Sequence, residues 1–146
     1  MRTILRIVTL AMVVLGLASA SLASDDGPGF IVIVNPDNPN DAVDRDFLRD
    51  VYLGKATEWG NGDAVHPIDL TERFAARDRF TEQVIRKTAA QLRTYWNQQI
   101  FSGKGVPPPE VDAAADVIEY VLSNRGAVGY LPADADPGKA KVIRIR

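Results

Sequence analysis

Cysteine is absent from this sequence, and histidine occurs once, at His66. Without cysteine the chain cannot form a disulfide, bind a metal through thiolates or use a cysteine nucleophile. A single histidine gives none of the ligand spacings of a protein metal site, so we expect no metal and no other cofactor. His66 also has no nucleophile or carboxylate at a diagnostic spacing. We therefore expect a protein that is not an enzyme.

Positive charge is also scarce. Lysine and arginine number 17 against 19 aspartate and glutamate, which gives a net charge of −2. Loss of an N-terminal leader that contains Arg2 and Arg6 would take the net charge to about −4. An acidic chain of this kind is a poor partner for nucleic acid or for an anionic membrane surface, so we expect neither.

A long hydrophobic run lies at the N-terminus. Residues 7–17 are apolar apart from two positions, follow two arginines and precede small residues suited to cleavage after Ala20 or Ala23. The run is too short to span a bilayer comfortably and is typical of a secretory signal peptide. The length that remains suits a single domain. The predicted organisation is a signal peptide at 1–23, a flexible tether at 24–29 and one domain at 30–146.

Hydrophobic periodicity predicts a layered domain. Residues 30–34 form a continuous β-branched apolar run, which is typical of a strand buried on both faces in the middle of a sheet. Apolar residues three and four apart indicate amphipathic helices further along the chain. The expected order predicts an α/β or α+β fold in which helices cover a small mixed sheet. Further strands are expected at 64–70, 127–131 and 141–145, with helices near 41–53, 71–85, 88–100 and 112–124.

Several residues are expected to end these helices or to line their buried faces. Gly54 stands where a left-handed C-terminal cap would end the first helix. The candidate N-terminal caps are Asn40 or Asp41, then Asp69 or Thr71, and then Asp112. The expected inward positions are Val43, Phe47 and Val51 in the first helix, Ala76, Phe80 and Val84 in the second, Leu92, Trp96 and Ile100 in the third, and Ala114, Ile118 and Val121 in the last.

Four short segments, taken in order, resemble the periplasmic phosphate-binding proteins. They are the Asn-Pro at 35–36, the Leu-Gly-Lys and Trp-Gly-Asn-Gly within 53–62, the Val-His-Pro-Ile at 65–68 and the Gly-Ala-Val-Gly-Tyr at 126–130. The resemblance is to short, single-lobe relatives of these proteins. It implies an α/β fold, a single periplasmic-binding-protein-like lobe with a small mixed sheet flanked by helices. It also implies a periplasmic protein that binds phosphate or a similar oxyanion for an ABC-type transporter.

The segment that holds the ligand in this family is altered here. The full-length proteins carry an arginine and then Ser-Gly-Thr at the start of the helix after the strand, where this chain has Asp-Leu-Thr-Glu-Arg-Phe-Ala-Ala-Arg at 69–77. The chain is also about half as long as a two-lobed binding protein, so we expect it to lack most of the other lobe. A second copy or a partner would have to complete the cleft.

With these parts missing, the resemblance still implies half of an anion-binding site. A helix N-terminus near Thr71 would offer free N–H groups and a hydroxyl, and Arg73 or Arg77 would add a guanidinium that fits phosphate oxygens. Glu72 opposes an anion there, because its carboxylate already complements the helix dipole. In the alternative interpretation Thr71 is only a helix cap and the arginines are solvated.

The turn at 53–59 also has two interpretations. Lys55 and Trp59 can form a docking surface for another protein, because a tryptophan in a turn can anchor an interface. Trp59 can instead bury its ring against the sheet edge and donate its N–H locally. The docking surface belongs to an alternative function, an interaction or sensor module of the cell envelope that keeps the fold and has lost ligand binding.

Overall fold

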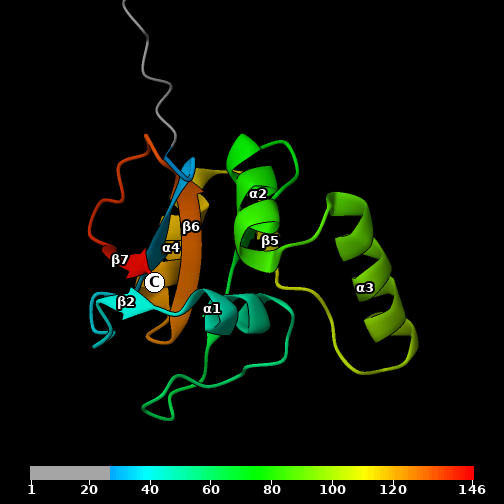
Figure 1. The fold of residues 1–146 in the computed structure, drawn as a ribbon. Helices are drawn as coiled ribbons and strands as arrows, with labels where there is room; N and C mark the ends of the chain where they lie inside the picture. Colours follow the sequence, from blue (N-terminus) through cyan, green and yellow to red (C-terminus); the bar gives the residue numbers. More distant parts are fainter. Residues whose placement is uncertain (1–26) are drawn as a thin grey trace, which may run out of the picture.

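The computed structural model describes residues 27–146. The predicted signal peptide at 1–23 and its cleavage sites lie outside this part of the chain. Within residues 27–146, no helix combines the length and the apolar character needed to cross a bilayer. These residues fold into two small sheets and the helices that pack against them (Figure 1).

A five-stranded mixed sheet forms the centre of the fold. The middle strand is antiparallel to both of its neighbours, and the two outer strands run parallel to theirs. The strands predicted at 30–34 and 141–145 are confirmed, and the apolar first strand lies in the middle, as expected. The order across the sheet is β2 (Ala42–Val43), β7 (Lys141–Ile145), β1 (Phe30–Val34), β6 (Ala127–Pro132) and β3 (His66–Pro67).

A second sheet consists of two very short parallel strands, β4 (Asp69–Leu70) and β5 (Glu110–Val111). The single strand predicted at 64–70 is therefore wrong, because it is divided between the two sheets at Ile68. The Ile68 N–H still donates to the carbonyl of Val128 in β6 at 3.0 Å, but the Asp69 N–H donates to the carbonyl of Pro109 at 2.9 Å. The chain thus leaves the central sheet at this residue and pairs with a segment that the sequence did not predict as a strand.

Helices surround the two sheets. Figure 1 shows α4 against the central sheet and α3 set apart from it beyond α2. The π-helical segment η1 continues α2 directly, and it is followed by its C-terminal cap residue, Arg86, whose φ of 59° is left-handed. The bounds are α1 (Arg45–Tyr52), α2 (Ala75–Phe80), η1 (Thr81–Ile85), α3 (Ala89–Phe101) and α4 (Ala114–Ser123).

The first helix begins later than the sequence predicts. Neither Asn40 nor Asp41 caps it, because the residues that follow them form β2, where Val43 pairs with Ile145 of β7. The carboxylate of Asp41 instead forms an ion pair with Lys141 at 2.8 Å. Val43 therefore contributes to the core from a strand and not from the helix.

The third helix begins as predicted but ends outside the core. Thr88 caps it through a capping box with Gln91, and Leu92 and Trp96 are buried. The prediction for Ile100 is wrong, because its exposed fraction is 51% and that of the next residue, Phe101, is 96%. The last turn of α3 therefore lies outside the part of the helix that packs against the core.

The last helix covers the central sheet through a face slightly different from the predicted one. Val117 and Val121 are fully buried, whereas Ala114 and Ile118 are half-buried. An ideal Cβ at Gly129 of β6 would lie 2.7 Å from Cγ1 of Val117. The helix can therefore lie directly on β6 only because residue 129 has no side chain.

An aromatic cluster joins the helices to the central sheet. The ring of Phe80 stacks on that of Tyr130 with centroids 4.0 Å apart, and the ring of Tyr52 meets Phe80 edge-on at 4.7 Å. The Tyr52 hydroxyl donates to the carbonyl of Ile68 at 2.8 Å. This packing fixes α1 and α2 on β6 and holds the Tyr130 hydroxyl beside Asp69.

Candidate functional site

The pairing of β4 with β5 brings residues 69–71, which include the predicted ligand residue Thr71, beside residues 110–112. Leu70 pairs with Val111, and the Thr71 N–H donates to the carbonyl of Val111 at 3.1 Å. Thr71 therefore lies beside Asp112, although the two residues are 41 positions apart in the sequence. We call this region, which consists of residues 69–77 and 110–112, the Thr71 corner.

The helix expected to start at Thr71 starts later. The N-terminal cap position of α2 is Phe74, no side chain caps the helix, and its first residue is Ala75. Neither Asp69 nor Thr71 acts as a cap, because both are engaged in the β4–β5 pairing or its continuation. The short turn that follows, in which the Phe74 N–H donates to the Thr71 carbonyl at 3.2 Å, separates the strand from the helix. The free helix N–H groups predicted beside Thr71 are thus not at that residue.

Thr71 and Arg73 converge on one carboxylate. The Thr71 hydroxyl donates to Oδ1 of Asp112 at 2.6 Å, and Arg73 forms an ion pair with the same oxygen through Nε. A second guanidinium nitrogen of Arg73 donates to the Asp112 main-chain carbonyl. Asp112 was predicted to cap the last helix, which is wrong, since α4 begins at Ala114 and its cap position is Ala113. The carboxylate is held by the Thr71 corner instead.

Arg77 is buried and paired, and the interpretation that it is a solvated arginine is therefore wrong. Its exposed fraction is 8%. Nη1 lies 3.2 Å from Oδ2 of Asp69 and 3.2 Å from Oε1 of Glu110, and it also donates to the carbonyl of Leu70. A buried guanidinium is tolerated because carboxylates and a carbonyl satisfy it.

Asp69 is the centre of this buried network. Its Oδ1 accepts hydrogen bonds from the Tyr130 hydroxyl and, at 2.9 Å, from the Leu70 N–H. Burial raises the pKa of Asp69 to about 6, against the lowering influence of the Arg77 charge and the Tyr130 hydrogen bond. Burial, with the nearby charge of Asp69, also raises the pKa of Tyr130 well above its usual range. Asp69 was predicted only as a helix cap, and the burial of its carboxylate was not predicted.

A cavity of about 140 Å³ lies against the network. The ionisable side chains that line it are four carboxylates, Asp69, Glu72, Asp78 and Glu110, and two arginines, Arg77 and Arg93. The Arg93 guanidinium lies 3.2 Å from the Glu72 carboxylate. The cavity is therefore lined by more acidic than basic groups, and every arginine in it is already paired. Within residues 27–146, no group of three or more His, Cys, Asp or Glu side chains is arranged to hold a metal ion.

The turn at 53–59 packs as its local interpretation predicts. Gly54 has a left-handed φ of 72°, which ends α1. Trp59 has an exposed fraction of 5%, and its Nε1–H donates to the carbonyl of Gly126 at 3.0 Å. Lys55 and His66 are exposed. A partner surface at Lys55 and Trp59 stays a prediction, and it would have to use Lys55, because the tryptophan ring is covered.

Trp59→Phe is expected to lower the free energy of unfolding by about 1 kcal/mol more than Trp96→Phe does. Both changes replace a buried indole with a smaller ring, but only Trp59→Phe removes a hydrogen bond, the one from Nε1 to the carbonyl of Gly126. That buried carbonyl is then left with one donor fewer. Urea denaturation of the two variants, followed by circular dichroism, measures the difference. Equal losses would show that the N–H contributes nothing to stability.

Comparison with known proteins identifies the fold. No protein-family model and no curated protein matches the sequence. Among solved structures, an ABC-type phosphate transport receptor from Vibrio cholerae is similar at 20% identity with a TM-score of 0.60, over 80% of this chain and 46% of the receptor. A protein from Clostridium perfringens assigned as a phosphate ABC transporter substrate-binding protein, with phosphate bound, matches at 20% identity and a TM-score of 0.62, over 80% and 44%. PstS from Borrelia burgdorferi matches at 12% identity and a TM-score of 0.61, over 81% and 47%.

The chain shares the fold of phosphate-binding proteins. It spans less than half the length of each of the three. The predicted fold class, a single periplasmic-binding-protein-like lobe with a small mixed sheet flanked by helices, is confirmed. At 12–20% identity the likeness is one of fold.

Proposed function

We propose that the protein is a non-enzymatic, periplasmic solute-binding protein that takes phosphate or a similar oxyanion at the Thr71 corner, in association with an ABC-type phosphate transporter. The observation that carries the proposal is the convergence of the Thr71 hydroxyl and the Arg73 guanidinium on a single carboxylate, that of Asp112. Hydroxyl and guanidinium donors of this kind are the groups that bind phosphate oxygens. The likeness of the fold to phosphate receptors supports the same ligand class.

In this proposal the Asp112 carboxylate occupies the position that a bound phosphate would take. The side chains of Arg73 and Asp112 are 63% and 64% exposed, so their ion pair contributes little stability and an incoming anion can displace the carboxylate. The released carboxylate and the acidic lining of the neighbouring cavity both repel a phosphate. We therefore expect weak binding of phosphate by a single copy of the unmodified chain.

Asp112→Ala is expected to raise the affinity for inorganic phosphate by about tenfold or more. The change removes the competing acceptor and one negative charge, and it frees the Thr71 hydroxyl and Nε of Arg73, whereas the Arg73 bond to the main-chain carbonyl of residue 112 remains. Titration calorimetry with phosphate, at several salt concentrations, measures the affinities. Asp116→Ala is the matched control, because it removes an exposed carboxylate from the first turn of α4 and should leave the affinity unchanged.

A second variant separates this site from others. Asp112→Ala combined with Arg73→Gln should lose the gained affinity, since the guanidinium that would hold phosphate is gone. Absence of phosphate binding in both the unmodified chain and Asp112→Ala would contradict the proposal. Binding that is equally strong in the two proteins would place the anion at another site.

The alternative function is an interaction or sensor module of the cell envelope that has kept the fold and lost the ligand. Two observations favour it. The arginines of the Thr71 corner are already paired with carboxylates of the chain itself. Apolar side chains are also exposed at the end of α3 and in the loop after it, where Phe101 is 96% and Val106 is 75% exposed. If calorimetry detects no phosphate binding by the unmodified chain or by Asp112→Ala, this alternative function is the better explanation of the structure.

A further inference from the structure

The strands β1 and β7 separate at one end. Their ladder runs from the pair Val34–Lys141 to the pair Val32–Ile143 and stops there. β1 continues along β6 as far as Phe30, which pairs with Pro132, whereas the end of β7 turns to β2, where Ile145 pairs with Val43. An opening therefore lies between the first residues of β1 and the last residues of β7, within what is otherwise a continuous sheet.

Main-chain groups on both sides of this opening face each other beyond the end of the ladder. In antiparallel pairs, successive residues direct their N–H and C=O groups to opposite neighbours. The Gly29 carbonyl accepts from Ala133 at 3.3 Å, so the main chain of Phe30 is directed to the side of β7. The Arg144 N–H donates to Asp41 at 3.1 Å, so the main chain of Ile145 is directed to the side of β1. If the register continued, Ile31 would lie opposite Arg144 and Phe30 opposite Ile145, but neither pair forms.

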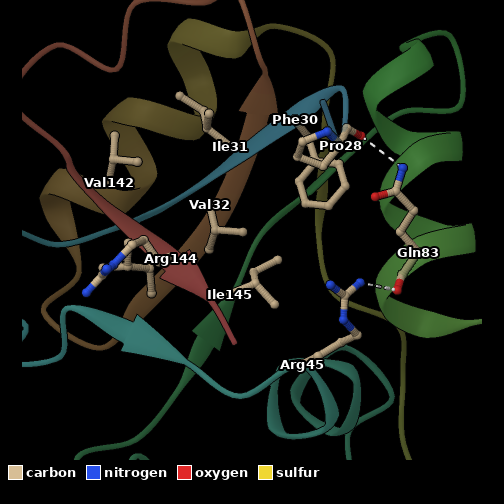
Figure 2. A pocket seen from close by; sticks show the side chains of 10 residues that line it. Pro28, Phe30, Ile31, Val32, Arg45, Gln83, Val142, Arg144 and Ile145 are labelled. Atoms are coloured by element: carbon tan, nitrogen blue, oxygen red, sulfur yellow. Dashed lines mark hydrogen bonds between the residues drawn. The ribbon is translucent and has the colours of Figure 1, made fainter. Parts of the chain in front are cut away.

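A cavity of about 500 Å³ occupies the opening, which is within the usual range for ligand sites (Figure 2). We call it the β1–β7 cleft. Aliphatic and aromatic side chains from the two strands make up most of its lining. They are Phe30, Ile31, Val32, Val142, Ile143 and Ile145.

Two arginines line the β1–β7 cleft, Arg45 and Arg144, and Arg45 stands at its end beside Gln83. Arg45, the first residue of α1, is half-buried, and its Nη1 donates to the Gln83 carbonyl at 2.8 Å. Figure 2 shows its side chain rising from α1 toward Gln83 at the edge of the opening. Arg45 forms no ion pair with a carboxylate of residues 27–146, whereas Arg49 and Arg77 each form two. A guanidinium carries five N–H donors, so donors remain for an anion in the cleft.

We propose that the β1–β7 cleft binds the C-terminal end of an extended apolar peptide. The peptide main chain adds to the free edges at Phe30 and Ile145, its side chains lie on the apolar lining, and its terminal carboxylate pairs with Arg45. Strand addition and capture of a terminal carboxylate are both established modes of peptide recognition, and here one cleft supplies the groups for each. This site is separate from the Thr71 corner and does not depend on phosphate binding.

The chemistry of the cleft favours a peptide over other carboxylates. A fatty acid would use the apolar lining and Arg45 but would leave the main-chain groups of Phe30 and Ile145 without partners, which is costly where they are shielded from water. Inorganic phosphate would gain the two arginines of the lining but would use neither the apolar side chains nor the main-chain groups of Phe30 and Ile145. The carboxyl end of a peptide is the ligand that satisfies all three features.

The test uses the peptide Ala-Val-Ile-Val, labelled at its N-terminus with fluorescein. Fluorescence polarisation with the unmodified chain is expected to show at least about tenfold tighter binding of the peptide with a free carboxylate than of the same peptide with a C-terminal amide. Sodium octanoate at the same concentration is expected not to compete. In nitrogen–proton correlation spectra, the amide signals of Phe30 and Ile145 should move on addition of the free peptide.

Arg45→Gln should weaken binding of the free peptide by about tenfold and leave that of the amide unchanged, because glutamine keeps a donor for Gln83 but carries no charge. Arg125→Gln, which changes an exposed arginine far from the cleft, is the control and should bind like the unmodified chain. Equal affinity for the free and the amidated peptide, no binding of either, or full competition by octanoate would overturn the proposal. The comparison of the two peptides uses the unmodified chain and so holds even if Arg45→Gln fails to fold.

Discussion

Gly126→Ala is expected to lower the free energy of unfolding by about 3 kcal/mol or more. An ideal Cβ at residue 126 would lie 1.8 Å from the carbonyl oxygen of Ala64 and 3.1 Å from its carbonyl carbon. Both atoms belong to the main chain, so no side-chain rotation relieves the clash, and one of the two segments must move. The Gly126 carbonyl also accepts from Trp59 Nε1 and from the His66 N–H, each at 3.0 Å. Movement of this segment therefore weakens two further hydrogen bonds.

Urea denaturation of Gly126→Ala, followed by tryptophan fluorescence and circular dichroism, measures the loss. The matched control is Gly60→Ala in the nearby turn, where no atom lies within 4 Å of an added Cβ and φ is not left-handed. The control should change stability by no more than about 0.5 kcal/mol. A loss below about 1 kcal/mol in Gly126→Ala would mean that the approach of residues 64 and 126 is looser than the structure describes.

Arg77→Met is expected to lower the free energy of unfolding at pH 7 by about 3 to 5 kcal/mol. The change leaves the Asp69 carboxylate buried without its cation, and it removes a donor from the buried carbonyl of Leu70. Arg73→Met is the matched control. It breaks an ion pair whose two side chains are more than 60% exposed, and it should cost less than about 1 kcal/mol. Similar losses in the two variants would show that the buried network contributes no more than a surface ion pair.

The same network predicts the pH dependence of stability. The pKa of Asp69 is about 6 in the folded protein and 3.8 in its ordinary state. Between these values the folded chain binds this proton more tightly than the unfolded chain does, so the contribution of Asp69 falls as pH rises from about 4 to above 6. The expected fall is about 2 to 3 kcal/mol. Asp69→Asn should flatten this part of the curve of stability against pH, and a curve unchanged by the substitution would contradict the assignment.

Two strands of the central sheet, at 30–34 and 141–145, could be predicted from the sequence, and both form with the predicted bounds. The first is a continuous apolar run in which four of five residues are buried, whereas Lys141 and Arg144 interrupt the second, in which Ile143 is the buried residue. The capping box of Thr88 likewise fixes the start of α3 from four neighbouring residues. In each case the information is local, which is the kind that a sequence pattern carries.

The starts of α1, α2 and α4 could not be predicted, and the reason is the same for all three. Asp41, Thr71 and Asp112 are suitable helix caps, but each has a partner from a distant segment. Asp41 pairs with Lys141, and Thr71 and Asp112 bind each other. A polar side chain shows in the sequence that it needs a partner, but it does not show which partner the fold supplies.

In the candidate site, too, local features could be predicted from the sequence and partners from distant segments could not. Thr71, Arg73 and Arg77 were expected to share one site, but the structure brings only Thr71 and Arg73 onto one partner, Asp112, and places Arg77 in the buried network with Asp69 and Glu110. The carboxylates that pair with them, Glu110 and Asp112, were not expected, because they arrive through the pairing of two strands of two residues each, β4 and β5. Strands of two residues show no periodicity in a sequence, so their pairing could not be predicted. The carboxylates that offset the arginines of the Thr71 corner are placed there by this pairing.

The outer edges of the central sheet have a consequence for how the protein behaves in concentrated solution. The sheet ends on either side in a strand of two residues, β2 and β3, and one residue of β3 is Pro67, which has no N–H to offer. An open strand edge is a template for the stacking of further chains, and short strands and proline are the usual means of blunting it. A chain without cysteine has no disulfide to restrain such growth. Colloidal stability is thus built into the ends of the sheet.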